Sequence, residues 1–224
     1  QGRINAIESW AIPDFFVDAG FLAPGASQDD GAADLSDCGT CANGHGTHVS
    51  GSVLGDGTLS GGTIVGVAPG ATLHFQATEQ YVDWSTSAEA AGFVDGYGLW
   101  GLPADLNDLF LQAYENGSRV HTNSWGSSVN GEYDESAQQA DQASYTYQDM
   151  VILFAASNDG IDVNSRDGEV DLDSLGSPGS AKNVLTVGAT ENGRTDLPTP
   201  SGSAGGPGDW GPDYGEPIGS DPNG

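Results

Sequence analysis

Two histidines that lie three positions apart are the clearest candidates for chemistry in this chain. His45 and His48 stand in residues 44–51, a run made mostly of glycine, threonine and serine. A zinc site would need a third ligand and a general-base glutamate nearby, and this window has neither. A histidine that titrates near neutral pH at the start of a helix suits a general base, and a purely structural histidine is the alternative.

Polar residues also follow two strand-like segments. Residues 120–123 lead into Ser-Trp-Gly, and the apolar run 150–156 leads into Ser157 and Asn158. An asparagine amide at such a point could donate a hydrogen bond to a developing oxyanion, whereas a turn asparagine is the simpler explanation of the residue taken alone. Residues 176–179 (Gly-Ser-Pro-Gly), followed by residues 181–189 (Ala-Lys-Asn-Val-Leu-Thr-Val-Gly-Ala), complete the set of patterns.

Strand-like and helix-like stretches alternate between these patterns. We expect strands at residues 73–78, 120–123, 150–156 and 184–189, and helices at residues 106–114 and 135–148. Such alternation favours an α/β fold with a parallel sheet covered by helices. Function in these sheets sits at the carboxyl ends of the strands, and the polar patterns fall there.

The charge of the chain limits its partners. Five basic residues against 32 acidic ones give a net charge of −27. Such a chain does not bind nucleic acid by neutralising phosphates, and it repels anionic membranes while attracting cations. It contains no run of about 18 apolar residues, so we expect no membrane insertion. The acidity fits a solvated coat, as in proteins adapted to salt, and also fits carboxylates clustered around calcium.

Two further features suggest a compartment and a metal. Cys38 and Cys41, in Cys-Gly-Thr-Cys, could be redox-active or half of a zinc site, but no second cysteine pair exists. We expect a small disulfide, hence an oxidising, secreted or cell-surface location. Oxygen ligands alternate around a glycine in an acidic stretch, which is close to an EF-hand-type calcium loop, although a solvated insertion is the alternative. The ligands that we expect are Asp162, Asn164, Asp167, Glu169, Asp171 and Asp173.

Taken together and in this order, the four patterns resemble the subtilisin-like serine peptidases, or subtilases. Residues 66–71 (Gly-Val-Ala-Pro-Gly-Ala) fit the same family, and residues 102–126 are most similar to its alkaline, oxidation-resistant branch. The resemblance covers residues 1–195. It implies a three-layer sandwich with a mainly parallel central sheet flanked by helices, incomplete in this chain. We expect a partial peptidase domain at residues 1–198, with an acidic insertion at 159–173, and a Gly/Pro/Asp-rich loop or linker at 199–224.

The resemblance also implies roles for individual residues. His45 matches the general base, His48 a structural histidine, and Asn158 the side-chain donor of the oxyanion hole. The substrate-binding residues that it implies are an edge segment for strand addition (Gly98, Leu99, Trp100) and the two walls of a specificity pocket (Ser124, Trp125, Gly126 and Ala155, Ala156, Ser157). The bulk of Trp100 would restrict the subsites next to the pocket.

The chain departs from the family at three points. It contains no Gly-Thr-Ser-Met-Ala-like motif, so this segment lacks the nucleophile and is expected to be inactive alone. Residues 16–20 imitate the strand end that carries the catalytic aspartate, but Asp18 lies close to His45 in sequence, and an aspartate upstream of Gln1 is the favoured alternative. Ser157 stands where a glycine is usual.

The sequence therefore favours a serine endopeptidase of the subtilisin type that acts on polypeptides by acyl transfer. Its partners would include the remaining segments of the same peptidase domain, and calcium would be a structural cofactor. The alternative is a non-catalytic, calcium-stabilised surface or structural module with a subtilase-like fold. A calcium-binding adhesive domain unrelated to proteolysis is a third possibility. The peptidase hypothesis depends on His45 and Asn158 converging on one cleft.

Overall fold

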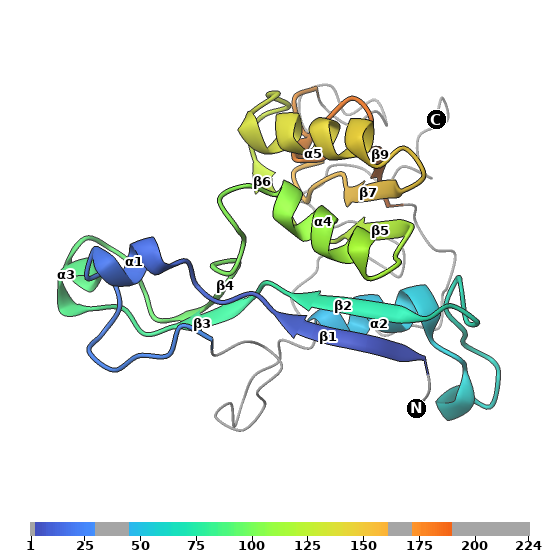
Figure 1. Cartoon of the computed structure of the whole chain (residues 1–224), viewed down its shortest axis with the longest axis horizontal. Helices are drawn as coiled ribbons and strands as arrows, with labels where there is room; N and C mark the ends of the chain where they lie inside the picture. Colours follow the sequence, from blue (N-terminus) through green and yellow to red (C-terminus); the bar gives the residue numbers. More distant parts are fainter. Residues whose placement is uncertain (1–2, 30–44, 161–171, 190–224) are drawn as a thin grey trace, which may run out of the picture. The chain divides into compact units, whose positions relative to one another are not determined.

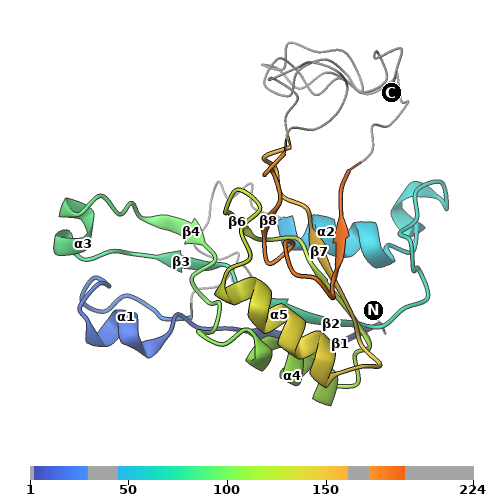
Figure 2. The ribbon, with the colours of Figure 1, turned by 90° about the horizontal axis from the view of Figure 1, so that it is seen from above.

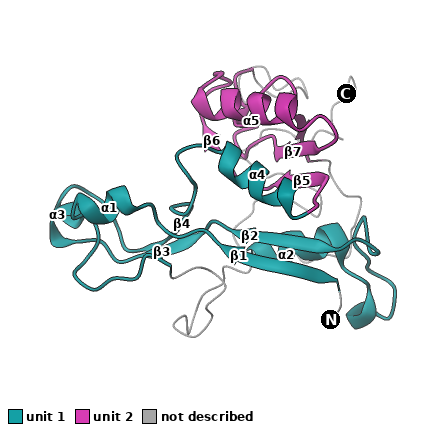
Figure 3. Cartoon of the chain, in the orientation of Figure 1, with its two compact units in different colours: residues 1–116 teal, residues 117–224 magenta. Residues whose placement is uncertain are grey.

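The computed structural model describes residues 3–29, 45–160 and 172–189 (Figure 1). The chain divides into two compact units, residues 1–116 and 117–224, which are described one at a time (Figure 3). The first unit contains, in chain order, β1 (Ile4–Ser9), α1 (Asp14–Asp18), α2 (His45–Leu54), a 3-10 turn η1 (Thr58–Ser60), β2 (Leu73–Ala77), β3 (Gln80–Val82), α3 (Thr86–Ala90), β4 (Gly96–Gly98) and α4 (Asn107–Glu115). The second contains β5 (Val120–Asn123), β6 (Ser127–Ser128), α5 (Glu135–Thr146), β7 (Val151–Ala155), β8 (Gly176–Ser177) and β9 (Leu185–Val187).

A parallel strand pair with a helix on each face organises the first unit. β1 pairs with β2 in parallel. Successive side chains of a strand point to opposite faces, and Gln76 turns toward α4, where its amide donates to the Leu109 carbonyl at 3.0 Å. Phe75 turns the other way, against Gly46 of α2. The sheet therefore lies between α4 and α2.

The first unit also contains an aromatic lobe, which we define as residues 12–22 with α1, and residues 80–100 with α3 and the antiparallel strands β3 and β4 (Figures 1 and 2). Its buried centre includes Ile12, Val82 and Trp84. The rings of Trp84 and Trp100 meet edge to face, with their centroids 4.9 Å apart. Edge-to-face pairs of this kind add about 0.5–1.5 kcal/mol to the burial of the rings.

Three parallel strands in the order β5-β7-β9 form the sheet of the second unit. One face carries Ile152 and Phe154, which are fully buried. α5 packs on this sheet, and its alanines at positions 137, 140 and 143 are completely buried, which lets the helix approach closely. Burial of side chains the size of Ile152 and Phe154 contributes about 1.5–3 kcal/mol each.

The predicted α/β fold, with parallel strands and covering helices, is confirmed. Each predicted strand and helix is present, and its ends agree with the predicted ones to within two residues. Asp18, the less favoured of the two candidates for the catalytic aspartate, is the exposed last residue of α1 and does not end a strand. Pro13 precedes this helix and the Phe16 ring packs 6.4 Å from that of Trp84, so a contact distant in sequence stabilises a helix where the residue types imitate a strand end.

Candidate functional site

His45 is the first residue of α2, as its place in the sequence predicts, and it is exposed. The next residue explains why the histidine stands where it does. A Cβ on Gly46 would lie 2.7 Å from Cζ of Phe75, so a larger residue here would displace the phenyl ring or move the first turn of α2 away from β2. Inside the helix, the Ser50 hydroxyl donates to the Gly46 carbonyl at 2.7 Å. The imidazole is thus presented to solvent by a first turn whose backbone is fixed.

The two segments predicted as pocket walls lie side by side. β5 and β7 are parallel neighbours, with Asn123 opposite Phe154, so the residues after both strands emerge at the same edge. The buried Asn123 amide donates to the Leu153 carbonyl at 3.0 Å and ties the two strand ends together. The Trp125 ring packs edge to face on Phe154, 5.3 Å away. Ser124, Trp125 and Gly126 therefore follow one strand end, and Ala156 and Ser157 follow its neighbour.

A third segment, β8, joins these walls. The antiparallel pair β6–β8 places Ser127 opposite Ser177. A Cβ on Gly126 would meet the Ser177 carbonyl oxygen at 2.8 Å, so this wall needs a glycine. The N–H of Gly176 donates to the Ala156 carbonyl at 3.0 Å. β8 thus touches both walls, and it is part of the Gly-Ser-Pro-Gly pattern seen in the sequence.

Asn158 lies at the exposed tip of a turn that two side-chain hydrogen bonds to Asp159 hold in place. Ser157 has φ of 115°, a region that favours glycine, and its hydroxyl donates to Oδ2 of Asp159 at 2.8 Å. The Ser128 hydroxyl donates to the same oxygen. These two hydrogen bonds, that from Ser128 first, lower the pKa of Asp159 below the ordinary aspartate value. Asp159 therefore stays ionised to a lower pH than an unperturbed aspartate. The two hydrogen bonds that hold the turn persist over the same range.

The third predicted binding segment belongs to the aromatic lobe. Gly98 ends β4, which pairs with β3 alone among the described strands, so the other side of β4 could accept an extended peptide. Leu99 is 39% exposed. The Trp100 ring folds back so closely that a Cβ on Gly98 would lie 2.5 Å from Nε1. The indole packs within the lobe, with its ring centroid 5.7 Å from that of Phe16.

The predicted site residues fall in both units. His45, Gly98, Leu99 and Trp100 lie in the first, whereas residues 124–126 and 155–158 lie in the second (Figure 3). In the second unit, the pairing of β5 with β7 brings residues 124–126 and 155–158 to the ends of neighbouring strands. The convergence of His45 and Asn158 stays a prediction.

Several predicted residues lie outside the described part of the chain: Cys38, Cys41, Asp162, Asn164, Asp167, Glu169 and Asp171. Asp173, the last expected calcium ligand, is described and is exposed with φ of 66°. Within residues 3–29, 45–160 and 172–189, no three His, Cys, Asp or Glu side chains form a group that could hold a metal ion. None of the helices in these ranges is long and apolar enough to cross a membrane.

Sequence reasoning missed two groups near the site. The first is the hydrogen bond from Ser128 to Asp159, which we call the clasp. It joins residues 31 positions apart, so it leaves no local pattern in the sequence. The second is Arg3, whose guanidinium contacts the end of α2. The only available signal for Arg3 was its rarity, since the chain has five basic residues in total.

The chain is similar in sequence to known proteins. A profile of the subtilase family, peptidase family S8, matches residues 24–213. Two proteins of Dictyostelium discoideum named serine protease/ABC transporter B family protein, tagD and tagB, are 34% and 32% identical to the chain over 156 residues, which is 66% of the chain. A third, tagA, is 25% identical over 150 residues. The matched region spans only 7–8% of the length of these relatives.

Proposed function

The chain belongs to the subtilase family, and from this premise we propose that it forms part of a serine endopeptidase that cleaves polypeptides by acyl transfer. The observation that supports the proposal best is the meeting of residues 124–126 with residues 155–158 at the ends of two neighbouring parallel strands. This is the edge at which sheets of this class bind their ligands. The relatives in Dictyostelium, whose names include serine protease, point to the same chemistry.

In the proposed mechanism, the serine hydroxyl attacks the carbonyl carbon of the scissile peptide bond and His45 accepts its proton. The Asn158 amide and a backbone N–H donate hydrogen bonds to the oxyanion that forms. His45 then passes the proton to the leaving amine, and an acyl-enzyme remains for water to hydrolyse. We propose that the serine and the aspartate that orients His45 lie in segments outside these 224 residues, the aspartate upstream and the serine downstream.

Substrate binding in this proposal uses the three wall segments. Gly98 and Leu99 would pair with the extended peptide, and the side chain before the scissile bond would lie between Gly126 and Ala156. Ser157 adds a hydroxyl to one wall, although its hydrogen bond to Asp159 keeps that group occupied. We assign the protein to the alkaline, oxidation-resistant branch on the sequence of residues 102–126. We also propose that residues 1–198 belong to the peptidase domain and that 199–224 are a loop or linker.

Labelling of the full-length protein by a fluorophosphonate tests the proposed function. Such probes react with an activated serine, so we expect one covalent label per molecule and hydrolysis of a peptide substrate. Prior denaturation should abolish the labelling. A well-folded, full-length protein that takes no label would contradict the peptidase function and favour the non-catalytic module.

The exposed face of the three-stranded sheet leads to a prediction about the segment alone. Val120, Val151, Leu185 and Val187 share this face through the strand register and are 45–67% exposed. Parallel sheets are normally covered on both faces, because their strands are apolar on both sides. Residues 1–224 expressed alone should therefore self-associate and unfold without a single cooperative transition, which size-exclusion chromatography and thermal melting would measure.

A matched variant checks the cause of that behaviour. Val120→Thr combined with Val187→Thr keeps the β-branched shape while removing apolar surface, and it should reduce the association of the segment. A cooperative, monomeric melt of the unchanged segment would show that no covering element is missing.

We propose calcium as a structural ligand of the acidic stretch that ends at Asp173, in a secreted or cell-surface protein. The proposal rests on the alternation of oxygen ligands in residues 162–173. In isothermal calorimetry, calcium should bind the full-length protein with measurable heat and should raise its melting temperature. Replacing Asp167 and Glu169 by Asn and Gln should abolish both effects. If calcium gives neither heat of binding nor a shift in the melting temperature of the unchanged protein, the proposed calcium site is wrong.

A further inference from the structure

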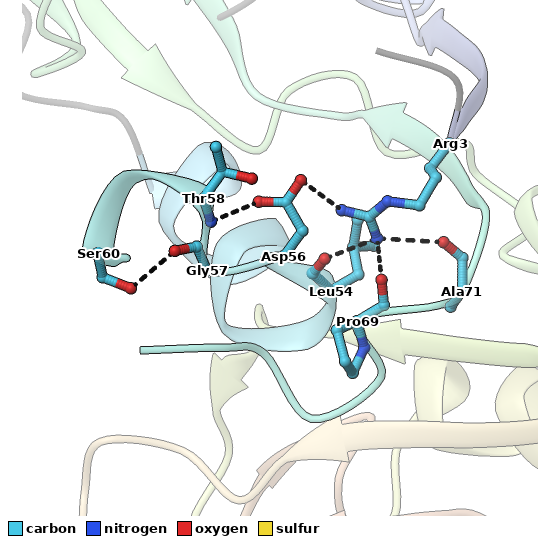
Figure 4. Close-up of polar contacts among 8 residues, drawn as sticks. All are labelled: Arg3, Leu54, Asp56, Gly57, Thr58, Ser60, Pro69 and Ala71. Carbon is cyan, nitrogen blue, oxygen red and sulfur yellow. Dashed lines mark hydrogen bonds and ion pairs between the residues drawn. The ribbon is translucent and has the colours of Figure 1, made fainter. Parts of the chain in front are cut away.

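A single arginine joins three segments of the first unit. Nη1 of Arg3 donates to the carbonyl oxygens of Leu54 at 2.8 Å and Pro69 at 2.7 Å, with a longer contact of 3.4 Å to Ala71 (Figure 4). Nη2 lies 3.7 Å from Oδ2 of Asp56. We call this group, Arg3 with Leu54, Asp56, Pro69 and Ala71, the Arg3 clamp. It connects the start of β1 with the end of α2 and with the segment that leads into β2.

The clamp completes the C-terminal end of α2. A helix leaves its last four carbonyl groups without intrahelical partners. Three of these carbonyls, at positions 51–53, accept the backbone N–H groups of Gly55, Val67 and Ala68 at 2.7–3.1 Å. The fourth, that of Leu54, accepts Arg3. A cation is also favoured at this end by the helix dipole, so the guanidinium is suited to the position in charge and in donors.

The two ends of α2 are thus held by different contacts. The first turn meets β2 through Gly46 and Phe75, where a Cβ on residue 46 would displace the phenyl ring. The last turn is tied to β1 by the guanidinium. A helix of ten residues is about 15 Å long and moves as a rigid rod, so a shift at its end also tilts its first residue. That first residue is His45.

We propose that Arg3 is a positioning residue for the peptidase reaction, in that it fixes the tilt of α2 and thereby the place of the His45 imidazole. This inference rests on the proposed function. Proton transfer requires the base within hydrogen-bond reach of the nucleophile, and displacement by about 1 Å can cost about 100-fold in rate. The role of Arg3 is exerted through carbonyl groups, so it does not require contact with substrate.

The carboxylate of the clamp contributes less than the carbonyls. A hydrogen bond from the Thr58 N–H, at 2.9 Å, is the main cause that lowers the pKa of Asp56, and Arg3 adds a smaller effect. The ion pair is long, and the Asp56 side chain is 57% exposed. Exposed ion pairs stabilise little. Asp56→Asn should therefore leave catalysis nearly unchanged, whereas loss of the guanidinium should not.

The test compares Arg3→Ala and Arg3→Lys with the unchanged full-length protein. We expect Arg3→Ala to lower kcat per folded molecule by about tenfold with KM within about twofold, because the proposed substrate contacts lie elsewhere. Arg3→Lys keeps a cation that can donate to Leu54 and should recover most of the loss. Arg119→Ala is the matched control, since it removes an exposed arginine that pairs with Asp149 at 2.9 Å, and it should change neither constant. All rates are measured well below the melting temperature of each variant.

Some outcomes would overturn the role of Arg3. If Arg3→Ala melts at a lower temperature but keeps the wild-type kcat per folded molecule, Arg3 is only structural. If Arg3→Ala lowers kcat/KM only by raising KM, with kcat unchanged, the positioning role of Arg3 is also contradicted. If Arg3→Ala does not fold, Arg3→Gln takes its place under the same criteria. If the unchanged full-length protein takes no fluorophosphonate label, the proposed peptidase function itself is wrong. The two failures are distinguishable, because in this case the wild-type protein is already inactive, whereas a failure of the Arg3 role leaves the wild-type protein active.

Discussion

Replacing His45 by alanine in the full-length protein is expected to lower kcat by about 10⁴- to 10⁶-fold, the range known for triad members of subtilisins, with little change in KM. Without the imidazole, no group accepts the serine proton or protonates the leaving amine. The side chain is exposed at the start of α2, so its loss should not disturb folding. Steady-state kinetics with a peptide anilide and the rate of fluorophosphonate labelling measure the effect.

His48 provides the matched control for this prediction. It lies three positions further along the same helix and is exposed, and its backbone carbonyl accepts the Ser52 hydroxyl at 3.2 Å whichever side chain is present. The resemblance gives His48 a structural role and no part in proton transfer, so His48→Ala should change kcat per folded molecule by no more than about twofold, even if it lowers the melting temperature. A His45→Ala variant that kept a tenth of the wild-type rate would exclude His45 as the general base.

The parts of the fold that the sequence predicted correctly are those encoded by local periodicity. The apolar run at residues 150–156 predicted a buried strand, and Ile152 and Phe154 of β7 are indeed buried. The helical spacing of Leu109, Phe110 and Ala113 predicted α4, and the three side chains are its buried face. Asn116 and Gly117 end that helix as predicted, with Gly117 at φ of 88°. Each of these features depends on neighbours within a few residues.

The parts that the sequence did not predict depend on contacts distant in the chain. Residues 16–20 have the composition of a strand end, yet α1 forms because Phe16 packs among rings contributed by positions 84 and 100. The Arg3 clamp joins residues 51–68 positions apart, and apart from the long ion pair with Asp56 its acceptors are backbone carbonyls. Every residue has a carbonyl, so such a site leaves no pattern of residue types. Only coordinates can show which carbonyls converge.

In the candidate site, too, the features encoded by neighbouring residues were predicted, and those that depend on distant contacts were not. The spacing of the polar patterns predicted that residues 124–126 and 155–158 would follow strands, and the structure makes those strands parallel neighbours. The clasp between Ser128 and Asp159 explains how a serine occupies a position with φ of 115° in place of a glycine. Backbone strain at such a position costs about 1–3 kcal/mol, and the two hydrogen bonds to Asp159 offset part of it. Ser157 and Ser128, whose hydroxyl helps to hold the turn, are far apart in sequence. The sequence alone therefore showed the serine at position 157 only as a departure from the family.

Replacing Asn158 by alanine is the second prediction with a large effect. We expect kcat to fall by about 10²- to 10³-fold with KM nearly unchanged, which is the loss known for the corresponding donor of a subtilisin. The amide donates only once charge develops on the carbonyl oxygen, so its removal affects the transition state more than the bound substrate. Asn130→Gly is the matched control, because Asn130 is an exposed amide in the same unit with φ of 51°, which glycine adopts without strain. It should leave both constants unchanged.

Asn158→Asp separates oxyanion binding from the simpler role of a turn residue. Aspartate has nearly the same shape as asparagine and is equally common in turns, so a turn role predicts wild-type kinetics and stability for this variant. An oxyanion role predicts the opposite, since the carboxylate cannot donate a hydrogen bond and its charge repels the developing oxyanion. Asn158→Asp should therefore be slower than Asn158→Ala while melting at the same temperature. Equal activity of Asn158→Asp and wild type would assign Asn158 to the turn alone and leave the backbone N–H as the sole proposed oxyanion donor.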